Sequence, residues 1–193
     1  MRLLLTLVLL LLGTTSFSQE LILPVDESGK YIFLEITELK LVPKSIMAAN
    51  AKRFFKANPK SMKLSSNEKD SIFLANGKMI VQKGVGAIGH PSAEVSYSLS
   101  LGLREGRYRL ILTDFIMTPY ERDRYGNFVP VTVSTPMERP PGKLGRADWD
   151  KNMAFVFNES RKIADKLKAM MVNTQAEPKQ EAKKPAAVST KEW

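Results

Sequence analysis

The strongest constraint on the fold is the alternation of apolar and polar residues along two adjacent segments, 93–103 and 107–117. In the first segment the alternating apolar residues are Val95, Tyr97, Leu99, Leu101 and Leu103. Glu105-Gly106 is typical of a turn, and the second segment resumes the alternation with Tyr108, Leu110, Leu112 and Ile116. A period of two predicts antiparallel strands with one buried and one solvent-exposed face. The rest of the chain must therefore supply a layer that covers the apolar side.

Two amphipathic helices are predicted to form that layer. One covers residues 45–58, and the second covers 149–172 after Asp148, a good N-cap residue. Strands are predicted over 31–38 and, as a hairpin turning at Asn76-Gly77, over 71–75 and 78–83. The order is then strand, helix, four strands, helix. It predicts an α+β two-layer sandwich, in which an antiparallel five-stranded sheet carries both helices on one face.

Residues 1–18 have the pattern of a secretory signal peptide: Arg2, an apolar run over 3–12 and small residues at Ser16 and Ser18. Cleavage is predicted between Ser18 and Gln19. A retained membrane anchor is the alternative, but the apolar run is half the length of a membrane span. The chain has no cysteine, which excludes a lipid anchor on an N-terminal cysteine. We therefore expect an exported, soluble protein, periplasmic or secreted, that is neither a lipoprotein nor transmembrane after cleavage.

The exported part is predicted to comprise three segments. Residues 19–145 form the sheet domain, ending in a Pro-rich connection at 119–145 with a short extended piece at 128–133. Residues 146–172 form the C-terminal amphipathic helix, which packs on the sheet. Residues 173–193 are rich in Lys, Ala, Glu, Pro and Gln and are predicted to be a disordered tail, because they cannot bury enough apolar surface to offset ordering.

Several kinds of chemistry find little support in the sequence. Without cysteine, and with His90 as the single histidine, thiolate catalysis and multi-histidine metal sites are excluded. Residues 84–89 fit G-x-G-x-x-G, but His90-Pro91 and a strand follow where dinucleotide binding requires a helix. Asp26, Glu121 and Asp123 are interpreted as surface carboxylates rather than a catalytic or metal-binding pair. We expect no catalytic residue, no metal and no cofactor.

The net charge of +9 indicates an anionic binding partner. An exported protein does not meet nucleic acid routinely, so anionic lipid, polysaccharide or an acidic protein is the expected counterpart. The sheet face opposite the helices mixes polar and apolar groups, as binding surfaces do. Its candidate residues are Ser96, Ser98, Arg107, Arg109, Ile111 and Phe115. The sequence leaves the ligand and the oligomeric state open.

Three functions follow from these observations. The first is a non-enzymatic binding or adaptor module of the cell envelope, and the second is peripheral binding to anionic lipid or polysaccharide. A hydrolase that uses His90 is the remote third. The hydrolase hypothesis would need a hydrolytic activity that is lost in a folded His90→Ala variant.

Four stretches resemble a Bacteroidota family of exported proteins described as a domain of unknown function with a TBP-like fold. They are residues 23–30, 51–55, 77–84 and 106–115, the last with the sequence Gly-Arg-Tyr-Arg-Leu-Ile-Leu-Thr-Asp-Phe. The resemblance implies a strand–helix–four-strand–helix topology and a Gram-negative envelope setting. It implies no activity, and the fold name does not by itself imply DNA binding.

Overall fold

The computed structural model describes residues 23–84 and 89–173. The predicted cleavage site at Ser18-Gln19, residues 85–88 of the glycine motif and residues 174–193 of the predicted tail lie outside the described residues.

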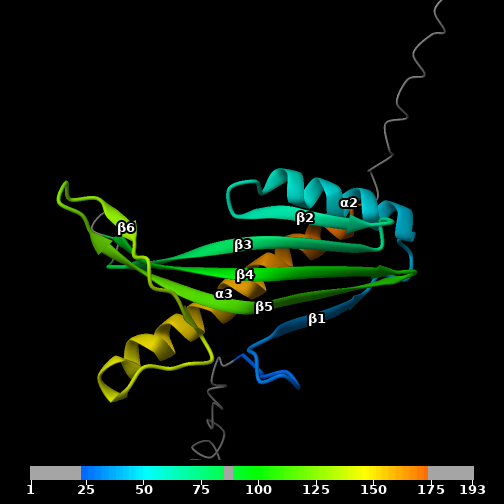
Figure 1. The fold of residues 1–193 in the computed structure, drawn as a ribbon. Helices are drawn as coiled ribbons and strands as arrows, with labels where there is room; N and C mark the ends of the chain where they lie inside the picture. Colours follow the sequence, from blue (N-terminus) through cyan, green and yellow to red (C-terminus); the bar gives the residue numbers. More distant parts are fainter. Residues whose placement is uncertain (1–22, 85–88, 174–193) are drawn as a thin grey trace, which may run out of the picture.

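Five antiparallel strands form the main sheet, in the spatial order β1-β5-β4-β3-β2 (Figure 1). In chain order the strands are β1 (Phe33–Glu38), β2 (Met62–Glu68), β3 (Ile72–Lys83), β4 (His90–Arg104) and β5 (Arg107–Arg122). The short strands β6 (Phe128–Pro130) and β7 (Thr135–Pro136) pair with the far part of β5. The turn predicted at Glu105-Gly106 joins β4 to β5, and Gly106 has the positive φ of 68° that such a tight turn requires.

Two helices cover one face of this sheet. They are α2 (Lys44–Ala57) and α3 (Arg146–Met171), the second preceded by the 3-10 turn η2 (Lys143–Gly145). The Phe55 ring of α2 stacks on Phe73 of β3, and the Phe157 ring of α3 meets Phe33 of β1 edge-on. Both strand residues point into the same core, and Figure 1 shows α3 crossing behind the sheet. The predicted fold class, an α+β sandwich with both helices on one side, is confirmed.

The hairpin predicted at Asn76-Gly77 is wrong, although five strands do form the main path of the sheet, as predicted. The turn lies at Lys69 and Asp70, with φ of 47° and 53°, and it joins β2 to β3. Gly77 instead lies mid-strand in β3, opposite Tyr97 of β4. A Cβ at this position would lie 2.3 Å from Tyr97 Cζ, so the glycine makes room for the Tyr97 ring.

The Pro-rich connection is more ordered than predicted. β5 continues to Arg122, and the chain then turns at 123–127 and returns as β6. β7 pairs with Ile116 and Met117, and Met137 is fully buried. α3 begins at Arg146, so Asp148 lies in its first turn and is not its N-cap.

Candidate binding face

The side of the sheet turned away from α2 and α3 is here called the open face. Side chains on paired strands form rows across it, because directly paired residues point to the same side. One row contains Leu34, Ile111, Ser100 and Leu74; the next contains Ile36, Arg109, Gly102 and Ile72. Leu34 is 51% exposed and Ile36 59% exposed, and Ile72 and Leu74 are also exposed. The open face therefore presents aliphatic side chains from three strands.

Five of the six residues predicted for this face lie on it, and the sixth does not. Ser96, Ser98, Arg107, Arg109 and Ile111 alternate with buried neighbours, which places them on the open face. Phe115 is wrongly predicted: it is fully buried in the core. The pairing of β4 with β5 shifts between Ser96 and Ser98, and Asp114 adopts a positive φ of 55°. This bulge inserts one extra residue, so the alternation reverses and Ile116 points outward in place of Phe115.

A hollow interrupts the open face at Gly102. Glycine has no side chain, and no atom lies within 4 Å of where a Cβ would be. The neighbours of Gly102 in its row are Ile72 on one side and Arg109 on the other. The resulting depression, here called the Gly102 hollow, has a volume of about 430 Å³. Its lining comes from Ile36, Ser71, Ile72, Gly102, Leu103, Arg104, Arg107, Tyr108 and Arg109.

Three arginines and no carboxylate line this hollow. Arg104 and Arg107 are direct partners across the β4–β5 hairpin, so two cations face each other. Such like-charge pairs destabilise a sheet unless something neutralises them. Among the described residues, neither these two nor Arg109 forms an ion pair. Two carboxylates lie outside the lining but beside it. Glu38 on β1 is the direct cross-strand partner of Arg107, although its ion pair is with Lys40 at 3.4 Å, and Glu68 on β2 is the partner of Ile72.

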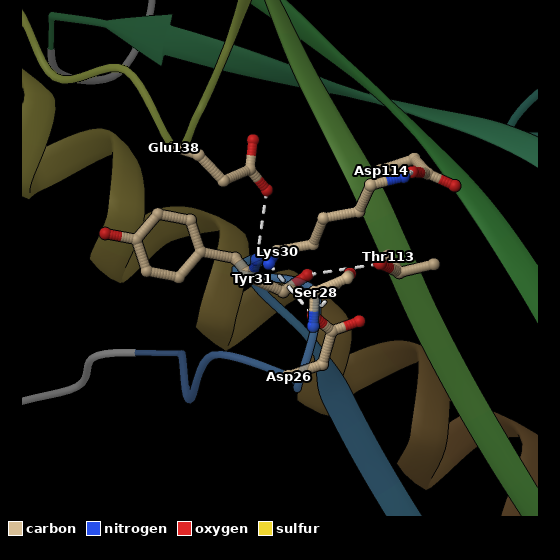
Figure 2. A network of polar contacts seen from close by, with 7 residues as sticks. All are labelled: Asp26, Ser28, Lys30, Tyr31, Thr113, Asp114 and Glu138. Carbon is tan, nitrogen blue, oxygen red and sulfur yellow. Dashed lines mark hydrogen bonds and ion pairs between the residues drawn. The ribbon is translucent and has the colours of Figure 1, made fainter.

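Asp26 belongs to a polar network away from the hollow (Figure 2). Its Oδ1 accepts hydrogen bonds from the Ser28 hydroxyl at 2.7 Å and from the Ser28 and Lys30 backbone N–H groups. These bonds lower the pKa of Asp26. Lys30 Nζ pairs with Asp114 at the bulge, and Tyr31 N–H donates to Glu138 at 2.9 Å. The network fastens the N-terminal loop to β5 and to the connection, which is a structural role.

Two other residues weighed for chemistry, Asp123 and His90, also have structural partners. Asp123 accepts hydrogen bonds from the Tyr125 and Asn127 backbone N–H groups, both at 2.8 Å, which shapes the β5–β6 turn. The His90 ring stacks on Phe128 at 4.4 Å between centroids, and its Nδ1 lies 3.2 Å from the Pro91 carbonyl oxygen. Over residues 23–84 and 89–173, no three His, Cys, Asp or Glu side chains gather where they could hold a metal.

The sequence did not point to the Gly102 hollow itself. Arg104 and Arg107 flank a predicted turn, and that spacing is the one signal that could have suggested paired cations. Ile36 and Ile72 could not be placed beside Gly102, because their position depends on which strands pair with β4 and β5. In the described part of the chain, no helix is long and apolar enough to cross a bilayer.

Comparison with known proteins supports the fold and leaves the activity open. No model of a known protein family matches the sequence, and no curated protein matches it. The structure is similar to a TBP-like protein from Parabacteroides distasonis, with a TM-score of 0.57, 14% identity and coverage of 78% of this chain and 97% of that one. It is also similar to a DUF4468 family protein from Bacteroides ovatus, with a TM-score of 0.57, 11% identity and coverage of 81% and 94%. The expected TBP-like fold is thus confirmed.

Proposed function

We propose that the protein is a non-enzymatic binding module of the cell envelope and that the open face is its binding surface. The observation that carries this proposal is the Gly102 hollow, set among exposed aliphatic side chains on a sheet face that neither α2 nor α3 covers. Isolated exposed apolar residues are ordinary, whereas a group of them beside a hollow is typical of interaction sites. Binding is favoured over catalysis because His90 is engaged with Phe128 at the far end of β4.

The test is capture of a partner in the native envelope, compared between variants. The full chain would be expressed in its native host, crosslinked and purified, and the bound proteins quantified. Leu34→Glu combined with Ile111→Glu places two charges on the open face and should abolish capture of any specific partner. Leu144→Glu alters an equally apolar residue that is fully exposed in η2, and it should leave capture unchanged. A partner captured equally by all variants would contradict the assignment of this face.

A second function, peripheral binding to anionic lipid or polysaccharide, is favoured by the arginines at the hollow. Such binding should weaken steeply as salt rises, because exposed charges are screened beyond about 8 Å at physiological ionic strength. Sedimentation with vesicles that contain or lack phosphatidylglycerol would measure it. Binding that does not change with salt, or that is equal for both kinds of vesicle, would contradict this function.

Export is part of the proposal and has its own test. Mass spectrometry of the protein recovered from envelope and culture fractions should find a chain that begins at Gln19. An intact chain that begins at Met1 and stays in the cytoplasm would contradict the envelope setting.

A further inference from the structure

We propose that the Gly102 hollow binds a single anionic amphiphile, with its carboxylate held by the arginines and its alkyl chain lying on the aliphatic rows of the open face. This inference rests on the proposed function, because it names a ligand class for the same surface. It is argued below from charge, from the kind of apolar surface and from the backbone beneath the hollow.

The charge at the hollow is complementary to a carboxylate. Arg104 and Arg107 face each other, and Arg109 follows two residues along β5 on the same side of the sheet. Arginine binds a carboxylate through two parallel hydrogen bonds, so a single carboxylate between two arginines can hydrogen-bond to both and lowers their combined charge from +2 to +1. Lys44 of α2 adds positive charge at the margin, where its Nζ donates to the Ser71 hydroxyl at 2.7 Å. Glu38, the cross-strand partner of Arg107, forms its ion pair with Lys40, so a bound carboxylate would add the direct partner that the arginine pair has not formed.

The apolar surface beside the arginines suits an alkyl chain. Ile36 and Ile72 flank the hollow, and the neighbouring row adds Leu34, Ile111 and Leu74. Rows on one face are about 7 Å apart, so a chain that leaves the arginines can lie along both. The large exposed apolar residues on this face are all aliphatic, without the exposed aromatic rings on which sugars stack. The hollow, at about 430 Å³, is within the usual range for small-molecule sites.

The backbone beneath the hollow favours an alkyl chain over an extended peptide. Gly102 pairs with Ile72 on β3 and with Arg109 on β5, so the hollow lies in the middle of the sheet and not at an edge. The backbone groups there are already used in the ladder, and a peptide lying across them would leave its own N–H and C=O groups unpaired. An alkyl chain has no such groups to satisfy.

The experiment is calorimetric titration of the full chain with laurate below its micelle concentration. Dodecyl maltoside has an alkyl chain one carbon longer and an uncharged head, and acetate has the carboxylate without the chain. We expect one laurate per protein, bound at least about tenfold more tightly than either control molecule. Gly102→Leu fills the hollow without altering charge and should abolish laurate binding. The free space above Gly102 should let this variant fold. Arg107→Gln should weaken binding by about tenfold or more. Arg53→Gln removes one exposed charge from α2 and should leave it unchanged.

Several outcomes would overturn the inference. The inference fails if Gly102→Leu still binds laurate, or if Arg53→Gln weakens laurate binding as much as Arg107→Gln does. It also fails if dodecyl maltoside binds as tightly as laurate. Binding to phosphatidylglycerol vesicles without binding to free laurate would show a membrane surface and not a single-molecule site. If laurate fails to bind while Leu34→Glu with Ile111→Glu still abolishes partner capture, the ligand class is wrong and the proposed function stands. If both experiments fail, the open face is not a binding surface.

Discussion

At the residue scale, two glycines in neighbouring strands have opposite roles. Gly77 on the core face is overlaid by the Tyr97 ring, whereas Gly102 on the open face has free space above it. Gly77→Ala should lower the free energy of unfolding by about 1–3 kcal/mol, because the buried ring cannot yield without disturbing its neighbours. Gly102→Ala should leave it unchanged or raise it by up to about 1 kcal/mol, because it restricts the unfolded chain. Urea unfolding of both variants measures the difference, and equal effects would contradict the packing described.

Tyr97 itself links core packing to alkaline pH. Burial raises the pKa of its hydroxyl to about 12, and among the described residues that hydroxyl has no hydrogen-bond partner. The stability of the folded chain that depends on a neutral Tyr97 hydroxyl is fully present below pH 10, the ordinary tyrosine pKa. It is lost as pH rises from 10 through about 12, because the hydroxyl then ionises more readily in the unfolded chain. Tyr97→Phe should abolish this part of the alkaline loss, about 2–3 kcal/mol at most. Unfolding curves across that range, compared with the unaltered chain, test it; identical pH profiles would count against it.

At the element scale, the bulge in β5 determines which residues form the core and which form the open face. It buries Phe115 and exposes Ile116, the reverse of the predicted alternation. Phe115→Ala should therefore cost about 3–5 kcal/mol of stability through the cavity that it leaves. Ile116→Ala, on the open face, should cost less than about 1 kcal/mol. Thermal or urea unfolding would show the contrast, and a costlier Ile116→Ala would mean that β5 continues in its original register.

The elements with a clear period were predictable, and those governed by their neighbours were not. β4 and the first part of β5 alternate because one side faces the core and the other faces water. β2 was missed because only Met62 of its seven residues is buried, as expected for an edge strand with little apolar pattern. Asn76-Gly77 favoured a turn locally, but the ring of Tyr97 requires a glycine mid-strand. The bulge at Asp114 carries no glycine that would have indicated it.

At the scale of the whole molecule, aspartate-capped turns give the fold an acid-sensitive component. Hydrogen bonds lower the pKa of Asp26 and Asp123, and the partners Lys52 and Asn67 lower that of Asp70. A lowered pKa contributes stability that is present above the unfolded value, 3.8, and is lost as pH falls through the folded value. The urea midpoint should therefore fall as pH drops below about 4, and it should fall less in a variant with all three aspartates changed to Asn. A midpoint that falls equally in both would contradict this assignment.

The candidate site, too, could be predicted from the sequence only in part. Its polar members on β4 and β5 follow from alternation, so Ser96, Ser98, Arg107, Arg109 and Ile111 could be assigned to one face. The hollow itself needs β1 and β3 on either side of the central hairpin, and that strand order is a property of the whole sheet. Long-range pairing of this kind leaves no local signal in a single sequence.

The position of Asn76-Gly77 within β3 also affects how the protein ages chemically. An asparagine followed by glycine is prone to deamidate, since the small residue lets the next backbone nitrogen attack the side-chain amide and close a five-membered ring. Here both residues are held extended between β2 and β4, and the Asn76 amide donates to the Ser65 hydroxyl at 3.2 Å. That ring cannot close until the strands separate. Slow conversion to aspartate and isoaspartate at this one peptide bond would therefore record how often β3 separates from its neighbouring strands.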